Sequence, residues 1–329
     1  MKMKSLFAFA SVAMALTACS NNEDAFVNSN FPEDGVIRVA TNVDAPATRS
    51  GMDNDNLTSF YMDVQNENST AYSYFVQMKK ESGTWNSYDG ADTKQMLWQN
   101  NTTPIKVTAA FLKDHAFTQA ELQGTVDFSV AADQSAADAA AIAANDLVGM
   151  AQTTIDPSTA DANLVNGKIK VTLGHALAKL NLKVTLGTEF NALEGGTTTN
   201  PITELAINGT KLNYTYTGTT AGVALTATGN NATAVTPFAG TYKAGSGETE
   251  NAVANYECIL VPQDIAAKGF SVSMTINGSS YTWTSEKAVS MAQGYAYTLE
   301  LTAGKEILTV KSLSAAAWGA ENTGSVATE

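Results

Sequence analysis

Short segments in which apolar and polar residues alternate recur along most of the chain. In residues 36–43, Ile37, Val39 and Val43 share one face of an extended strand, while the residues between them face the other way. This period of two is typical of half-buried β-strands. Similar strand-like segments predict further strands at 57–64, 72–79, 105–111, 125–130, 168–173, 180–186, 202–207, 211–217, 223–228, 233–238, 256–262, 270–276, 280–284, 295–301 and 307–313.

Turn-forming residues separate these segments. Asn277-Gly278 lies between two alternating runs, and this dipeptide favours a tight hairpin because a type I′ turn needs positive φ at both central positions. Many short strands at this spacing predict β-sandwiches. The Ala-rich stretch 131–144 predicts one short surface helix, with a low-complexity loop as the alternative. The fold class expected from the pattern is therefore all-β.

Length and charge narrow the class of protein further. The chain has 329 residues, 44% of them hydrophobic, which is about twice the single-domain norm of roughly 150 residues. The Gly/Thr/Asn-rich stretch 187–201 predicts the boundary between two domains. The net charge of −13 argues against a nucleic-acid partner, which needs a basic surface. Two Cys and two His are too few for a closed zinc site, so we expect no metal and no cofactor.

The N-terminus has the pattern of an export signal. Lys2 and Lys4 precede the apolar run 6–16, which is too short to span a membrane comfortably and typical of a signal peptide. Leu16-Thr17-Ala18-Cys19 resembles the bacterial lipobox, which predicts cleavage after residue 18, lipid on Cys19 and an outer-membrane location of the precursor. Cys258 then has no disulfide partner and is expected to be a small buried hydrophobe.

No motif indicates an enzyme. His175 lies between strand-like segments and is expected to be a packed, hydrogen-bonded structural residue, whereas His115 is expected in a solvated loop. Nucleophile-elbow, zincin, phosphate-binding and dinucleotide-binding motifs are absent from the sequence. The scattered carboxylates leave a glycosidase-type pair open, and Trp85 or Trp98 could offer a sugar-stacking surface.

Several motifs, taken in order, resemble those of one family. The chain is similar to the fimbrillins, the type V pilins of the Bacteroidetes, which include the major-fimbrillin-like subunits. The features that carry the resemblance are the lipobox at Cys19, the protease-type site Ala47-Thr48-Arg49-Ser50, the run 173–182, and the C-terminal runs 259–263, 293–299 and 310–319.

The resemblance implies a fold and a route of assembly. It implies two transthyretin-like β-sandwich domains, a signal peptide (1–18), a lipidated propeptide that includes the first strand (19–49), an N-terminal domain (50–187) with the Ala-rich helix, and a C-terminal domain (188–329). An arginine-specific protease is expected to cut between Arg49 and Ser50. Ile37, Val39 and Val43 would leave with the propeptide, and a strand of another subunit would fill the vacated groove. The implied partners are other fimbrial subunits, as a homopolymer and with accessory pilins.

The sequence supports this route independently. Arg38 and Arg49 are the chain's only arginines, and a protease that recognises guanidinium rather than ammonium finds no other target. Arg38 lies inside a predicted strand, whereas Arg49 lies in a loop flanked by Pro and Gly, where nicking concentrates. Loss of residues 36–43 would forfeit about 5–9 kcal/mol of apolar burial, which an incoming strand recovers.

The donor is expected in the C-terminal region. Residues 307–317 are strand-like, and the candidate donor residues are Leu308, Val310, Leu313 and Trp318. An ordinary last strand of the second domain is the alternative reading.

The main functional reading is a structural pilin of an adhesive surface fimbrium, not an enzyme. A tip adhesin or glycan-binding lipoprotein of the same fold, with a host glycan or protein as partner, is the alternative.

Overall fold

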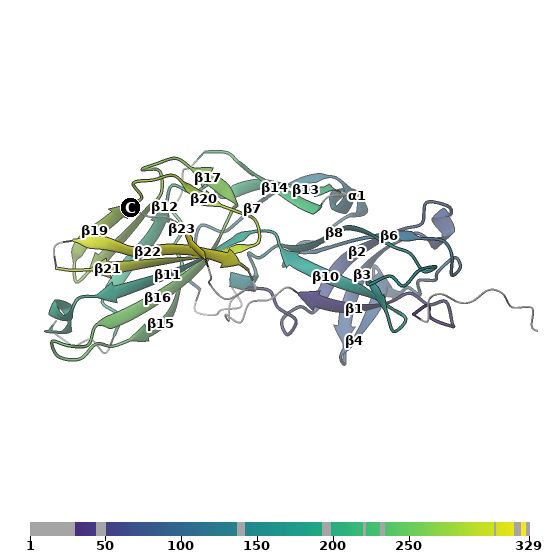
Figure 1. The fold of residues 1–329 in the computed structure, drawn as a ribbon, viewed down its shortest axis with the longest axis horizontal. Helices are drawn as coiled ribbons and strands as arrows, with labels where there is room; N and C mark the ends of the chain where they lie inside the picture. The colour runs from purple at the N-terminus through teal and green to yellow at the C-terminus, as the bar shows by residue number, and fades with distance from the viewer. Residues whose placement is uncertain are drawn as a thin grey trace, which may run out of the picture.

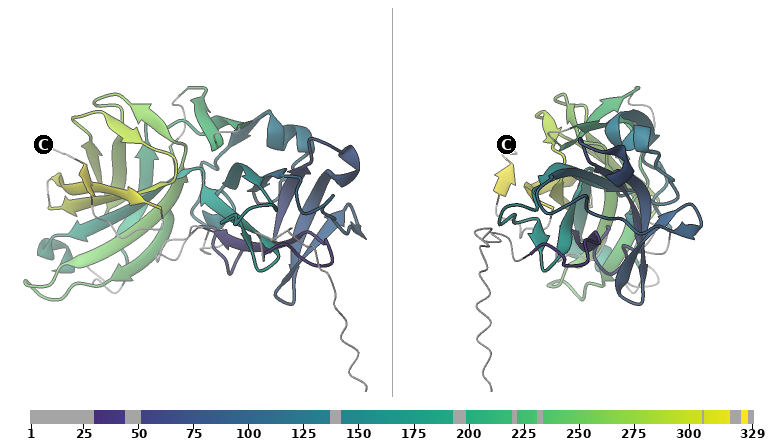
Figure 2. Two further views of the ribbon diagram at one scale, coloured as in Figure 1. Left: turned by 45° about the vertical axis from the view of Figure 1, so that its right-hand side comes forward. Right: turned by 90° about the vertical axis from the view of Figure 1, so that its right-hand side faces the viewer.

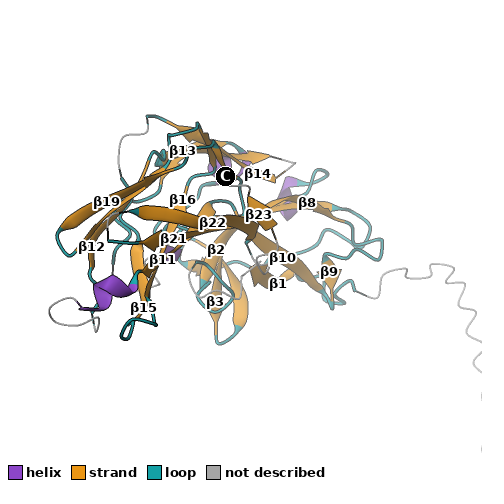
Figure 3. Cartoon of the chain, turned by 60° about the vertical axis from the view of Figure 1, so that its left-hand side comes forward, coloured by secondary structure: helices purple, strands orange, loops and turns teal. Residues whose placement is uncertain are grey.

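The computed structural model describes residues 30–43, 51–136, 142–192, 199–219, 222–230, 234–305, 307–318 and 324–326. Within these residues strands dominate (Figure 3), which confirms the predicted all-β fold class with β-sandwich domains. The two largest sheets lie toward opposite ends of an elongated molecule (Figure 1), and the end-on view is much narrower (Figure 2).

Nine of the described strands form the first sheet, in the order β1-β10-β8-β6-β2-β3-β4-β5, with β9 beside β10. The pair β1-β10 is parallel, and the other pairs of this sheet are antiparallel. Side chains such as Phe60, Val107 and Val171 form its core. The strands are β1 (Arg38–Val43), β2 (Ser59–Gln65), β3 (Tyr74–Glu81), β4 (Thr84–Asp89), β5 (Asp92–Thr93), β6 (Ile105–Phe111), β8 (Val148–Ile155), β9 (Leu164–Val165) and β10 (Lys168–His175).

A second sandwich combines a six-stranded sheet, β15-β16-β11-β21-β22-β23, with the three-stranded sheet β12-β18-β19 of the described chain. Leu182 and Leu299 from the larger sheet share one core with Val272 from the smaller. The strands are β11 (Ala178–Leu186), β12 (Ile202–Asn208), β15 (Phe238–Lys243), β16 (Ala252–Leu260), β18 (Ser271–Ile276), β19 (Ser279–Thr284), β21 (Tyr295–Ala303), β22 (Leu308–Ala317) and β23 (Gly324–Val326); β17 (Gln263–Ile265) pairs separately with β20 (Val289–Met291).

A third core joins the two sandwiches. It contains apolar side chains of β13 (Asn213–Thr219) and of α1 (Gln119–Gln123), and residues that follow β10 and β16. The chain crosses between sandwiches at Ala176 and Leu177, so that β11 already belongs to the second sheet. This crossing precedes the domain boundary expected at residue 187, which stays a prediction. β13 also pairs with β7 (Thr125–Ser129) and β14 (Gly222–Thr228).

Local sequence explains several of these elements. Asn277 and Gly278 have φ of 48° and 77° and join β18 to β19, as the type I′ signal predicts. Thr118 and Glu121 form a capping box at the start of α1, a helix that the alternation pattern missed. Short 3₁₀ helices lie at Thr70–Tyr72 and Thr188–Ala192.

Two predicted elements differ from the structure. The strand expected at 233–238 is wrong, because only Val235 and Thr236 make isolated bridges there and β15 begins at Phe238. Within the Ala-rich stretch 131–144, residues 131–136 are not helical, 137–141 lie outside the described residues, and Ile142 and Ala143 are helical.

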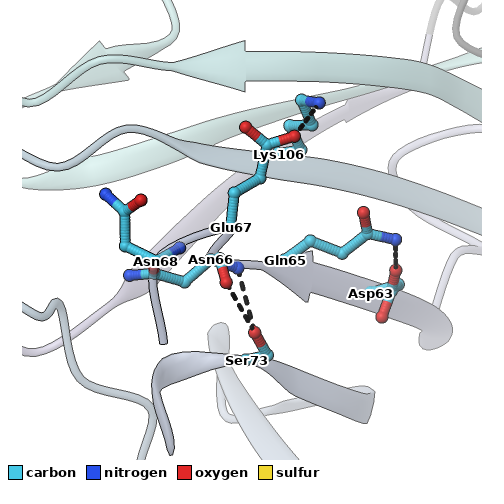
Figure 4. A network of polar contacts seen from close by, with 7 residues as sticks. All are labelled: Asp63, Gln65, Asn66, Glu67, Asn68, Ser73 and Lys106. Atoms are coloured by element: carbon cyan, nitrogen blue, oxygen red, sulfur yellow. Dashed lines mark hydrogen bonds and ion pairs between the residues drawn. The ribbon is translucent and has the colours of Figure 1, made fainter. Parts of the chain in front are cut away.

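A polar network holds the turn after β2 (Figure 4). The Asn66 backbone N–H donates to Ser73 Oγ at 2.9 Å, and Glu67 pairs with Lys106. Asp63 is fully buried and accepts bonds from the amides of Gln65, Gln119 and Gln123 at 2.6–2.7 Å. Because these amides come from β2 and α1, Asp63 ties the helix to the sheet.

Candidate functional site

Strand β1 lies at the edge of the first sheet. Its register with β10 places Val39 opposite Ile169 and Val43 opposite Leu173. Ile37, Val39 and Val43 are 4%, 5% and 2% exposed, because alternate side chains of a strand point to the same face. The structure therefore places the three residues of the predicted displaced strand together in the core.

A groove runs beside the other edge of β1. It has a cavity volume of about 630 Å³, and residues 36–41 form one wall. Just before β1, the Ile37 N–H donates to Met96 O at 2.9 Å, so the two walls touch there. Met78, Trp85 and Met96 contribute apolar surface to the groove. No Asp or Glu is among its described lining residues, which include four basic residues: Arg38, Lys80, Lys94 and Lys168.

Arg38 has a fixed environment in β1. Its guanidinium makes two hydrogen bonds to Asp34, at 2.9 and 2.5 Å. These bonds, together with one from the Val36 N–H, lower the pKa of the Asp34 carboxyl to about 2. Lys168 lies opposite Arg38 in the parallel ladder. Like charges at opposite positions repel each other and destabilise the strand pair. Arg38 is thus part of a paired strand.

Cys19, Arg49 and Ser50, the predicted lipidation and processing residues, lie outside the described residues. Gly51 is the next residue that the structure describes, and Met52 is 3% exposed. The Met52 N–H donates to Asp146 Oδ2 at 2.8 Å. The chain that follows the predicted cut is therefore fixed to the body of the protein.

Asp146 belongs to what we call the junction cluster: Gly51, Met52, Asp146, His175 and Trp318. His175 Nδ1 lies 2.8 Å from Asp146 Oδ2, and the two side chains are 1% and 0% exposed. The Trp318 ring stacks on His175 with centroids 4.0 Å apart and planes 4° from parallel. His175 is thus packed and hydrogen-bonded, as predicted.

Sequence reasoning missed Asp146. It lies 29 positions from His175 and follows the Ala-rich stretch, with no motif around it. The pair meets because β8 and β10 are neighbours, with Val148 opposite His175. Both side chains are closed to solvent, so the pair is not arranged to receive a substrate.

The donor candidates belong to one strand and its end. Leu308 and Leu313 of β22 are 8% and 4% exposed, and Val310 packs against the same core. Trp318 follows β22 and is 4% exposed. β22 pairs with β21 along its length and with β23 over Leu313–Ala315. In this structure the candidate donor strand is folded into its own subunit.

The remaining candidate residues have simpler roles. Cys258 is buried, as predicted, and burial raises the pKa of its thiol. Trp98 is 5% exposed and contacts Phe31, so it offers no open stacking face. His115 lies in a loop, as predicted, but its side chain is only 26% exposed, and its ring lies edge-on to two Phe rings at 4.6 and 4.8 Å. Trp85 lines the groove beside β1.

Metal-binding groups and membrane-spanning helices are both absent from the residues that the structure describes. No group of three or more His, Cys, Asp or Glu in the described ranges could hold a metal ion. Among the described helices, none is long and apolar enough to cross a membrane.

One family model matches most of the chain. The family model described as fimbrillin-like matches residues 44–318. The search of curated proteins finds no match.

Three solved structures resemble this chain. A proposed cell adhesion protein from Bacteroides uniformis has 15% identity and a TM-score of 0.56, covering 87% of this chain and 99% of its own. Another from Bacteroides ovatus has 15% identity and a TM-score of 0.58, covering 89% and 99%. The tip fimbrial protein Mfa3 from Porphyromonas gingivalis, C-terminally truncated, has 11% identity and a TM-score of 0.48, covering 86% and 99%. At these identities, the first two establish the fold alone.

Proposed function

This chain belongs to the fimbrillin-like family, which makes it a fimbrial subunit or adhesin of the cell surface, and we propose that it is a stalk subunit that polymerises by donor-strand exchange. The precursor carries a lipid on Cys19, which holds it in the outer membrane. An arginine-specific protease cuts after Arg49 and releases residues 19–49, which we call the leader. A C-terminal strand of a neighbouring subunit then takes the place of β1.

The position of β1 is the observation that carries this proposal. β1 is an edge strand, and its one ladder in the described sheet is the parallel pair with β10. It contributes the buried residues Ile37, Val39 and Val43. At about 1.5–3 kcal/mol for each buried apolar side chain, its loss removes roughly 5–9 kcal/mol of burial. An incoming strand restores that burial and the main-chain bonds to β10.

The sequence position of Arg49 fits this role. Arg49 lies between β1 and Met52, the residue that is bonded to Asp146. A cut there separates the leader from the body without breaking a strand of the first sheet. Arg38, the other arginine, lies within the β1 ladder and is paired with Asp34. Paired edge backbone resists proteolysis better than a loop.

Replacement of the two arginines tests the proposal. We expect Arg49→Ala and Arg49→Lys to accumulate on the cell as an uncleaved lipoprotein and to form no fibres, as seen by immunoblot and electron microscopy. Arg38→Lys is the matched control and is expected to be processed normally. Normal processing of Arg49→Ala would disprove the cleavage step, and fibres built from the uncleaved form would disprove strand exchange.

A tip adhesin is the second candidate. The groove beside β1 favours it, because Trp85 and three lysines without a lining carboxylate could hold an anionic glycan. Immunogold labelling separates the two roles: a stalk subunit labels along the fibre, and a tip adhesin only at its end.

A further inference from the structure

Three buried polar atoms of the junction cluster have no hydrogen-bond partner within the described chain. They are Asp146 Oδ1, His175 Nε2 and Trp318 Nε1. Buried polar groups without partners are rare in native proteins, and each calls for a physical explanation. Here they gather where the chain enters the body of the protein after the predicted cut.

Asp146 has an unused acceptor. Its Oδ2 atom interacts with both the Met52 N–H and His175 Nδ1, each at 2.8 Å. A carboxylate offers two oxygens and about four acceptor sites, so Oδ1 leaves capacity for another donor. The side chain is 0% exposed, and a buried carboxylate is stabilised by a positively charged partner.

Gly51 brings the backbone against this carboxylate. A Cβ at Gly51 would lie 3.0 Å from the Trp318 ring and 3.2 Å from Asp146 Oδ2, and φ is +121°. The chain therefore passes Asp146 at the position of a glycine. Gly51 and Met52, the first two described residues after the predicted cut, thus both lie against Asp146.

We propose that Asp146 binds the α-ammonium group that cleavage after Arg49 creates on Ser50. The inference rests on the proposed processing. Hydrolysis of the Arg49–Ser50 peptide bond consumes one water, leaves a carboxylate on Arg49 and gives Ser50 a primary amine, which takes up a proton near neutral pH. The precursor has only a neutral amide at this position, so the ion pair exists in the processed chain alone.

The proposed ion pair has a consequence for the donor strand. Asp146 contacts His175, and the His175 ring stacks on Trp318 at the end of β22. The processed N-terminus and the candidate donor strand thus end at one buried cluster. Cleavage would add a positive charge at the junction cluster. The mature subunit would therefore differ from the precursor in two ways: it lacks β1, and it carries this charge.

The reactivity of the new amine tests the proposal. The purified full-length precursor is cleaved with an arginine-specific protease and labelled with 2-pyridinecarboxaldehyde, which reacts with α-amines and not with lysine. Mass spectrometry then gives the labelling rate at Ser50. We expect labelling about tenfold slower in the folded protein than in concentrated urea, which corresponds to a protection of about 1.4 kcal/mol. Asp146→Asn should remove the protection, and Asp133→Asn, at an exposed position, should keep it.

An insertion variant avoids any change in the core. One alanine placed between Arg49 and Ser50 moves the ammonium one residue away and leaves Asp146 intact. We expect this variant to fold and to lose the protection. Equal rates for the wild type with and without urea, or protection that survives the insertion, would overturn the site. If the mass shows no cut after Arg49, the processing and the ammonium site both fall, whereas a cut followed by fast labelling removes the site alone.

Discussion

Val39 of β1 lies directly opposite Ile169 of β10, and both side chains are buried. The next residue, Ala40, lies opposite Lys170 and is exposed. β1 thus contains, at adjacent positions, a residue that anchors it in the core and a residue that faces solvent.

This contrast gives a matched pair of variants. Val39→Asp would put a carboxylate into an apolar site and should lower the free energy of unfolding of the precursor by about 3 kcal/mol. Ala40→Asp should change it by less than about 0.5 kcal/mol, as is usual at exposed positions. Urea unfolding of the purified precursors measures both values.

After cleavage and removal of the leader, both variants should become identical to the processed wild type, because the changed residue has left. A processed Val39→Asp chain that still differs would show that β1 stays bound.

The C-terminal segment gives a second prediction. Deletion of residues 307–329 removes β22 and β23 and should leave a processed monomer that forms no SDS-resistant oligomers. It should also be less stable by about 3–6 kcal/mol, since Leu308 and Leu313 leave the core of the second sandwich. Gel electrophoresis and urea unfolding measure the two effects.

A shorter deletion locates the donor. Removal of residues 319–329 takes away β23 but keeps β22, and we expect this variant to polymerise. If the short deletion already abolishes the oligomers, the donor lies beyond Trp318 and β22 stays in its own subunit. Oligomer ladders from the long deletion would place the donor outside the C-terminal region.

The sequence predicted the half-buried strands because alternation records which face is buried. In β11 and β18, every second residue is buried, and the alternation pattern predicted both strands. β4 has no buried residue, and β15 is exposed or intermediate throughout. No alternating apolar pattern exists in such strands, and β4 was missed while β15 was misplaced.

Long-range pairings were beyond the sequence pattern. Alternation placed Val39 on a buried face but could not show that β1 pairs with β10 in parallel, since the partners lie about 130 residues apart. The Asp146–His175 pair depends in the same way on neighbouring strands. The capping box at Thr118 and Glu121 was readable, because its two residues are close in sequence.

Tyr216 gives a prediction about alkaline pH. Burial raises the pKa of its phenol to about 12, and its hydroxyl has no hydrogen-bond partner within the described residues. Unfolded tyrosine ionises near pH 10, so between about pH 10 and 12 the unfolded state binds fewer protons and stability falls as pH rises. Two pH units correspond to about 2–3 kcal/mol.

We expect Tyr216→Phe to unfold like the wild type at about pH 8, because no bond is lost, and to be the more stable of the two at about pH 12. Urea unfolding at both pH values measures the difference. If the free energy of unfolding falls equally in the two proteins, the pKa of Tyr216 is not higher in the folded than in the unfolded state, and the prediction is wrong.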